Sequence, residues 1–232
     1  MRIFQRKYLL LLTILWHLHS FGQTQLSEVD TLRIEYPKVI EYLQRQMAEG
    51  LRTFNDVKPS FQTGESIEDY HVIDREFLVK DSLEKVWNDY LSAVLQESWN
   101  TKTIRFGFCY SRNNDSIYYS NDKVRTVMPG LIVYLNLKLL YGMKQLAVAF
   151  EITRIDQDEK MLEFSYLEGN ETEGKQQLFF RENNKGNTVI AHLSYYRSSS
   201  KARDKLYPHL HAQLINKFHR NMKLINKNKY EN

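Results

Sequence analysis

Apolar and polar residues alternate with a period of two over much of the second half of the chain, the pattern of strands with one buried face. Ile104 and Phe106, for example, flank the polar Arg105. Short polar connections such as 182–186 separate these segments and suit hairpins. We therefore predict an antiparallel meander with strands at 104–110, 131–139, 146–152, 162–166, 176–180 and 189–195.

A helical period of 3.6 replaces the alternation in three other segments. An apolar stripe from Leu83 to Leu95 follows Asp81, which precedes Glu84 by three residues, as in a capping box. Pro37 opens another stripe, which runs to about residue 54. After Ser200 the helical period continues almost to the end of the chain, and Pro208 either begins this helix or kinks it. Its apolar half carries Leu206, Tyr207, Leu210, His211, Leu214, Ile215, Phe218, Met222 and Ile225.

The segment Phe77-Leu-Val-Lys-Asp-Ser-Leu-Glu-Lys-Val-Trp87 resembles the strand-to-helix entry of the START-like superfamily, also called Bet v 1-like, polyketide cyclase-like or SRPBCC. The order of predicted elements is also that of this superfamily: a strand, here at 67–80, then a helix, many strands and a long terminal helix. The resemblance covers about 67–228 and implies an α+β helix-grip fold, a curved antiparallel sheet of about six or seven strands around the C-terminal helix. It also implies an apolar cavity between sheet and helix.

The first 22 residues differ from the rest of the chain. Arg2, Arg6 and Lys7 precede an apolar run at 8–16, and Ser20-Phe21-Gly22 supplies small residues at the cleavage spacing. This order predicts a signal peptide at 1–22 and an exported protein, periplasmic or secreted. An uncleaved N-terminal anchor is the alternative reading. The remaining chain then divides into a helical extension and linker at 23–66 and the START-like domain at 67–228.

The formal net charge of +4 lies mainly at the two ends of the chain. Residues 201–232 carry eight Lys or Arg residues against Asp204 and Glu231. Without the signal peptide the chain is nearly neutral, so nucleic-acid binding is not indicated. The basic terminal helix is compatible with weak contact to an anionic membrane surface, or with an ordinary solvated face.

Aromatic residues dominate the predicted inner face of the sheet, and a few hydrogen-bonding groups accompany them, as in small-molecule sites. The same rings also suit a filled core, so both readings stay open. His211 stands out because it lies on the apolar stripe of the terminal helix, where it would orient a ligand, exchange a proton or bond a core neighbour. The candidate cavity residues are Phe106, Phe108, Tyr110, Phe150, Phe164, Tyr166, Gln176, Tyr195, His211 and Phe218.

No metal or cofactor is expected from the remaining reactive residues. His209 and His219 fall outside the apolar stripe, and His192 is predicted on the polar face of its strand, so no metal-ligand spacing arises. Cys109 is the single cysteine and is interpreted as a strand residue rather than a nucleophile.

Three functions are compatible with these features. The first is an exported START-like protein that binds or carries an apolar or aromatic small molecule between the sheet and the terminal helix. The second is a cyclase- or aromatase-like enzyme that uses the same cavity, with His211 handling a proton. The third is a protein-interaction module with a filled core. Ligand identity and oligomeric state do not follow from the sequence.

Overall fold

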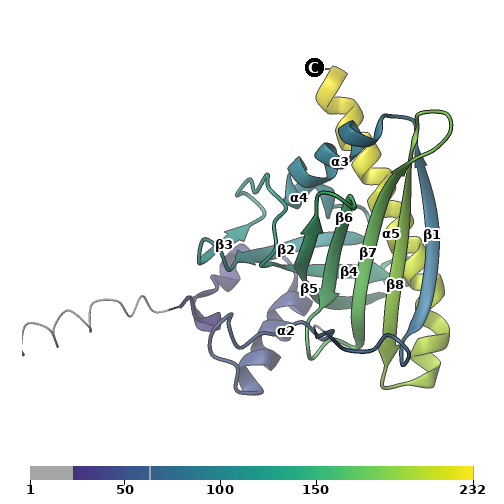
Figure 1. Cartoon of the computed structure of the whole chain (residues 1–232). Coiled ribbons are helices and arrows are strands. Elements are labelled where there is room, and N and C mark those ends of the chain that lie inside the picture. Colours follow the sequence, from purple (N-terminus) through teal and green to yellow (C-terminus); the bar gives the residue numbers. More distant parts are fainter. Residues whose placement is uncertain (1–22, 63, 232) are drawn as a thin grey trace, which may run out of the picture.

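The computed structural model describes residues 23–62 and 64–231, and the predicted signal peptide at 1–22 lies outside these residues. One eight-stranded antiparallel sheet forms the centre, in the order β1-β8-β7-β6-β5-β4-β2-β3. Figure 1 shows this sheet beside the long terminal helix α5. The strands are β1 (His71–Val79), β2 (Ile104–Ser111), β3 (Ser116–Tyr119), β4 (Leu131–Leu139), β5 (Lys144–Asp156), β6 (Met161–Tyr166), β7 (Thr172–Glu182) and β8 (Thr188–Ser198).

Every alternating segment of the sequence forms a strand, and the predicted α+β fold with a curved antiparallel sheet and a long C-terminal helix is confirmed. The sheet has eight strands rather than six or seven, because β3 was not predicted. This edge strand comprises only Ser116–Tyr119 and follows a turn in which Asp115 has a φ of 46°. Four residues are too few to display a period of two.

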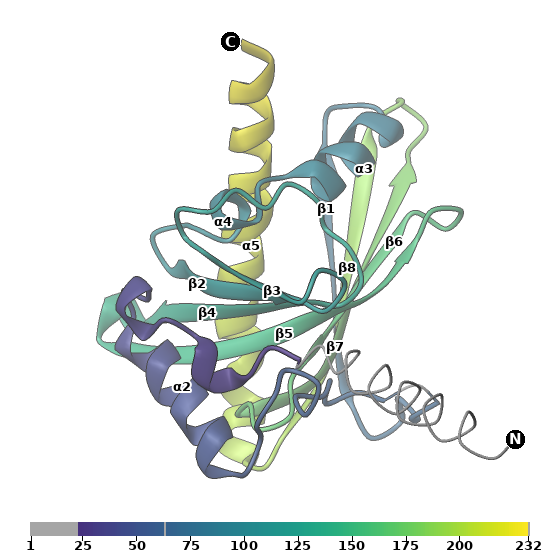
Figure 2. The same ribbon diagram turned by 90° about the vertical axis from the view of Figure 1, so that its left-hand side faces the viewer.

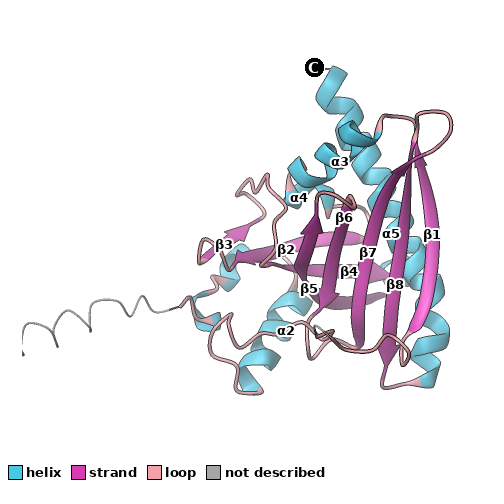
Figure 3. Cartoon of the chain, in the orientation of Figure 1, coloured by secondary structure: helices cyan, strands magenta, loops and turns pink. Residues whose placement is uncertain are grey.

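The helices lie on both sides of the sheet (Figure 3). The predicted helix behind Asp81 breaks at Ala93, whose ψ of 140° is extended, so that two helices form. Its N-cap, Ser82, makes no side-chain capping bond, so the expected capping box does not form. The terminal helix begins at Lys201, which places Pro208 inside it. The helices are α2 (Pro37–Ala48), α3 (Leu83–Ser92), α4 (Leu95–Ser98) and α5 (Lys201–Glu231), with 3-10 turns η2 (Leu26–Glu28), η3 (Thr31–Arg33) and η4 (Leu140–Gly142).

The terminal helix α5 crosses one face of the sheet, as Figure 2 shows. Phe218 and Met222 of α5 are buried there against the aromatic residues of β5 and β6. Trp87 of α3, 1% exposed, packs edge-on against Phe180 of β7 and closes one end of this core. We call this face of the sheet the inner face, because the C-terminal helix lies on it.

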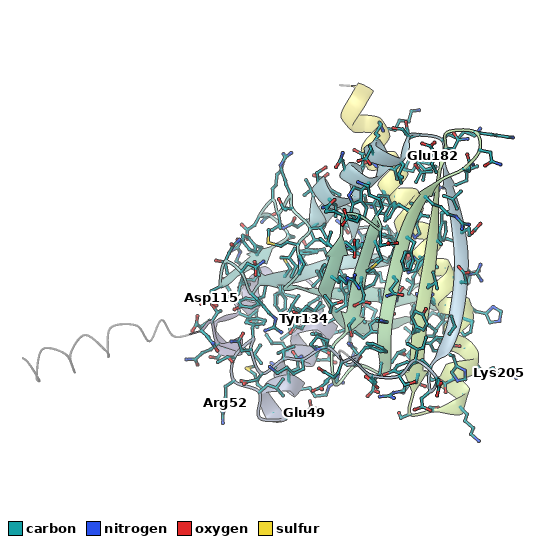
Figure 4. All side chains as sticks on the ribbon, in the orientation of Figure 1. Glu49, Arg52, Asp115, Tyr134, Glu182 and Lys205 are labelled. Carbon is teal, nitrogen blue, oxygen red and sulfur yellow. The ribbon has the colours of Figure 1, made fainter. Side chains whose placement is uncertain are left out.

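The N-terminal extension (23–62) covers the opposite, outer face of the β2-β4-β5 part of the sheet. Phe54 stacks on Tyr110 with ring centroids 4.0 Å apart, and Tyr134 stacks on Phe108 at 4.2 Å. Figure 4 shows Tyr134 inside the molecule. The extension therefore supplies a second apolar core rather than a loose linker, because the sheet buries residues on both faces here.

A β-bulge in β2 decides which of its aromatic rings belong to which core. The pairing register with β4 shifts between Phe106 and Phe108. Phe106 therefore packs in the inner core, whereas Phe108 and Tyr110 pack in the outer core against the extension. The prediction that all three rings share one face is wrong. Gly107 sits at the shift, where an added Cβ would lie 3.0 Å from both Val39 Cγ1 of α2 and the Tyr134 carbonyl oxygen.

The solvent side of α5 carries exposed Lys205, Lys217 and Lys223. Figure 4 shows Lys205 at the surface near the beginning of the helix. No helix within the described residues is long and apolar enough to cross a membrane. Weak contact of this basic face with a membrane surface stays a prediction.

Arg112 joins the extension to the sheet. Its guanidinium donates to both carboxylate oxygens of Glu151, at 2.9 Å each, and to the carbonyl oxygens of Phe54 and Val57, both at 2.7 Å. The side chain of Glu151 is only 10% exposed. Because the charge is largely withdrawn from water, the pair depends on both partners being present.

We expect Arg112→Leu to lower the free energy of unfolding by about 3 kcal/mol, since it leaves the Glu151 carboxylate buried without its cation. Urea denaturation measures this change. The matched control is Arg154→Leu, which removes an ion pair with Asp156 from an arginine side chain that is 60% exposed. That change should cost less than about 1 kcal/mol. Equal losses in the two variants would contradict the role given to Arg112.

Candidate ligand site between the sheet and the terminal helix

Two adjoining hollows lie between the inner face of the sheet and α5. The inner hollow has a volume of about 60 Å³ and the outer one about 120 Å³. The sheet provides one wall and the apolar stripe of α5 the other, which is where the START-like resemblance places a cavity. The two hollows share Leu137, Val148, Tyr166, His211 and Leu214 as lining residues.

Aromatic rings pack against one another between the sheet and the helix. Trp99 stacks on Phe218 with ring centroids 4.1 Å apart and also contacts Phe150 at 5.0 Å. Phe150 in turn packs 4.9 Å from Phe164. These contacts leave an inner hollow with almost wholly hydrocarbon walls, so the space is a small apolar chamber rather than a wide channel.

A network of buried hydrogen bonds, which we call the buried polar chain, runs along the inner face beside this chamber. Gln176 is its centre, since its side-chain oxygen accepts from Nε2 of His192 at 2.5 Å and from Nε2 of His211 at 2.9 Å. The Nδ1 atom of His192 lies 2.9 Å from Nε2 of His219, and Nδ1 of His219 lies 2.7 Å from the Tyr90 hydroxyl.

The second arm of the chain consists of hydroxyl groups. The Gln176 amide nitrogen donates to the Tyr166 hydroxyl at 2.6 Å. That hydroxyl lies 2.8 Å from the hydroxyl of Tyr207, which lies 3.2 Å from Oγ of Ser194. Strands β6, β7 and β8 and helices α3 and α5 thus contribute to one continuous network, so it ties the helix to the sheet.

The orientation of the Gln176 amide decides where the imidazole protons lie. With its oxygen toward both rings, that oxygen accepts only, so both His192 and His211 carry their proton on Nε2. Nδ1 of His192 is then an acceptor, which places the proton of His219 on its Nε2. Nδ1 of His219 accepts in turn from the Tyr90 hydroxyl. All three imidazoles are neutral in this arrangement, and each tautomer follows from its neighbour.

Burial holds these imidazoles neutral. Loss of solvation lowers the pKa of His211 to about 3, assisted by the positive charge of Arg75. The pKa of His219 falls to about 3, chiefly through burial and further through His211. Burial and the two neighbouring histidines also lower the pKa of His192 well below its usual value. Burial raises the pKa of Tyr166 to about 12. The cluster therefore carries no charge at neutral pH.

Six of the ten sequence-predicted cavity residues line the inner hollow, and a seventh, Phe106, packs in the inner core behind it. Phe108 and Tyr110 lie in the outer core instead, as described above. Tyr195 also faces away, because the inner face of β8 carries Ile190, His192 and Ser194. The six lining residues are Phe150, Phe164, Tyr166, Gln176, His211 and Phe218.

Sequence reasoning missed His192 and His219. Both faces of β8 carry apolar residues, so the alternation did not show which one is buried. His219 is buried because α3 and β1 also flank α5, placing Tyr90 and Phe77 against its ring. The buried arc of α5 is therefore wider than half of the helical wheel. No sequence pattern marks these two residues, because His192, His211 and His219 come together only in the folded chain.

Within the described residues no group of three or more His, Cys, Asp or Glu side chains is placed to hold a metal ion. Cys109 is buried in β2, and burial raises the pKa of its thiol. A thiol with a raised pKa is a poor nucleophile, which supports its interpretation as a packing residue.

A curved antiparallel sheet with a long helix across it and a small apolar chamber between them defines the helix-grip class. No family model matches the chain, and no curated protein matches it by sequence. Among solved structures, a norcoclaurine synthase mutant from Thalictrum flavum has a TM-score of 0.52 at 11% identity, covering 69% of this chain and 96% of that one.

Major latex-like protein 151 from Panax ginseng has a TM-score of 0.50 at 12% identity, covering 68% of this chain and 97% of that one. At these identities the similarity concerns the fold alone. The chain therefore has the fold of the START-like, Bet v 1-like superfamily, as the sequence predicted.

The three buried histidines predict how stability depends on pH. The unfolded chain takes up protons on them below about pH 6.5, whereas the folded protein keeps His211 and His219 neutral down to about pH 3. Between these values the unfolded state binds more protons, so stability falls as the pH falls; above about pH 6.5 these groups have no effect. Each histidine contributes a slope of about 1.4 kcal/mol per pH unit.

Urea denaturation between pH 7 and pH 4 measures this slope. His219→Gln removes one of the three groups and should make the slope shallower by the contribution of one proton. His209→Gln, on the solvent side of the same helix, is the matched control and should leave the slope unchanged. Identical slopes for the wild type and His219→Gln would show that His219 is not held neutral in the folded protein.

Proposed function

We propose that this protein binds or carries a small apolar or aromatic molecule between the sheet and α5. The supporting observation is the pair of adjoining hollows of about 60 and 120 Å³, lined mainly by hydrocarbon. An engineered cavity of about 150 Å³ in another protein is large enough for benzene. The hollows therefore suit a ligand of about one ring, and they favour binding over the filled-core interaction module.

A protein of the same fold supports this proposal. The norcoclaurine synthase structure contains a transition-state analogue, so that protein holds a small molecule. The present hollows are smaller than the 300–1,000 Å³ typical of sites for drug-sized ligands. A ligand larger than one ring would therefore require α5 or the aromatic side chains to move.

The electrostatics of the chamber favour binding over catalysis. A general acid or base works best when its pKa lies near the working pH. The pKa of His211 is lowered to about 3 and that of Tyr166 is raised to about 12, so neither group exchanges protons readily at neutral pH. We therefore place the cyclase- or aromatase-like alternative second.

Filling the chamber should abolish binding. Leu214 lines both hollows, so Leu214→Trp should lower the affinity for toluene at least about tenfold, or about 1.4 kcal/mol. Leu224→Trp, at a position that is 53% exposed on the same helix, is the matched control and should bind toluene like the wild type. Calorimetric titration of the three proteins makes the comparison. If the wild type binds no toluene, or all three bind it equally, the chamber is not the binding site.

We also propose that the protein is exported, on the strength of the basic, apolar and small-residue order of residues 1–22. The mature chain should then begin near Gln23. Intact-mass measurement of protein isolated from its native cells tests this. An intact Met1 terminus on cytoplasmic protein would contradict export, and an intact terminus on membrane-bound protein would indicate the uncleaved anchor.

A further inference from the structure

We propose that the turn between β4 and β5, residues 140–143, anchors this protein to the surface of a bilayer that contains anionic lipid. We call these four residues the apolar turn. Leu140, Tyr141 and Met143 enter the interface of the bilayer, and the lysine side chains beside them contact the headgroups. The inference concerns a surface outside the chamber and does not depend on which ligand the chamber holds.

Three apolar side chains of this turn have little cover within the protein. Tyr141 is fully exposed, Met143 is 83% exposed and Leu140 is 50% exposed. Only nine large apolar side chains of the described residues are exposed, and three of them fall within these four positions. Single apolar residues are ordinary on a protein surface, whereas a cluster of them marks a contact with something outside the fold.

The backbone of the apolar turn is strained. Leu140 has a φ of 49° and Tyr141 a φ of 57°, so two consecutive residues with large side chains adopt the left-handed conformation. This conformation suits glycine and is unfavourable for bulky residues. Because the side chain of Tyr141 is fully exposed, packing within the fold does not explain a tyrosine at this position. Strain of this kind is characteristic of segments that carry a function.

The charged residues of the turn and of the shallow hollow beside it are positive. Lys138 and Lys144 stand on the two strands that the turn joins, and they are the only charged residues in 131–150. Lys217 of α5 lines the shallow hollow between the helix and the turn. Among the described residues, no carboxylate lines this hollow. The carboxylate of Glu171, in the outer hollow nearby, is paired with an arginine of α5.

These features favour a lipid surface over a protein partner. A standard protein interface buries about 800 Å² on each side, more than a turn of four residues supplies. A bilayer needs no matching pocket, because apolar side chains enter the acyl boundary while lysine and tyrosine keep their polar ends among the headgroups. Anionic lipid complements the three lysines, since each cation near the surface adds to the attraction.

The apolar turn also lies beside the chamber. Leu139 and Lys144 flank the turn and line the outer hollow. Leu214 of α5 lines both hollows of the chamber and the shallow hollow at the turn. A bilayer contact at the turn therefore brings the chamber close to an apolar phase in which small apolar molecules dissolve.

Flotation with lipid vesicles tests the inference on the mature protein. We expect binding to vesicles of phosphatidylcholine with about one third phosphatidylglycerol, and at least about fivefold weaker binding to pure phosphatidylcholine. Tyr141→Gly combined with Met143→Ser should weaken binding to the anionic vesicles about tenfold. The melting temperature should not fall, because glycine adopts a φ of 57° without strain. Leu32→Ser, at a position that is 97% exposed in η3, is the matched control and should bind like the wild type.

A second pair of variants shows which surface meets the lipid. Lys144→Gln removes a charge beside the turn and should weaken binding to the anionic vesicles about fivefold. Lys223→Gln removes a charge from the solvent side of α5 and should have a smaller effect. If Lys223→Gln has the larger effect and the variant of Tyr141 and Met143 binds like the wild type, the helix makes the contact and the inference is overturned.

Fluorescence reports directly on insertion of the turn. Tyr141→Trp should show a blue-shifted emission on the anionic vesicles, after subtraction of the wild-type spectrum, whereas Leu32→Trp should not. A vesicle-bound protein in which Trp at position 141 keeps the emission of an indole in water would overturn the inference. So would a wild type that ignores both kinds of vesicle. If that wild type is a dimer by light scattering and the variant of Tyr141 and Met143 is a monomer, the turn is instead an interface between two copies of this chain.

Discussion

The structure depends on one constraint: the β2-β4-β5 part of the sheet is apolar on both faces. Eight of the nine residues of β4 are buried, so each face there needs its own cover. The terminal helix covers the inner face and the N-terminal extension the outer one. Arg112 bonds the extension to the sheet, and the absence of a side chain at Gly107 lets α2 lie close to β2, so the extension covers the outer face.

This two-sided burial also explains what the sequence could and could not predict. A period of two identified the strands, because alternation appears wherever the faces differ. It did not identify the face of Phe108, since the bulge at Gly107 changes the register without changing the composition of the segment. The prediction for Tyr195 was wrong for another reason. Leu193 and Tyr195 resemble core residues, yet they lie on the face of β8 opposite to that of the buried His192. When both faces of a strand carry apolar residues, the period of two does not tell which face lies toward the terminal helix. That depends on the elements that cover each face.

The polar part of the site shows the same limit. His211 was found because it interrupts an apolar stripe, and Gln176 because it lies among inward-facing strand residues. His219 was not found, since its burial depends on the packing of α3 and β1 against α5. A helical wheel shows only the residues of one helix and not the elements around it. The three histidines are 192, 211 and 219, and they meet through Gln176 and one another. Their tautomers are set by contact, so the vacant acceptor of His211 could be recognised only in the folded chain.

The same hydrogen bonds that tie α5 to the sheet also keep the three imidazoles neutral. Three imidazoles without a counter-ion are tolerable in an apolar core only while they are neutral, and neutrality requires each ring to have one donor and one acceptor. Gln176 receives two donated bonds, and the relay through His192 and His219 ends at the Tyr90 hydroxyl. Every lone pair in that relay is used, whereas in the branch to His211 no group donates to the lone pair of Nδ1. Because Gln176 accepts from both His192 and His211, the relay continues through His192 alone, and Nδ1 of His211 is the one nitrogen of the three imidazoles that has no partner.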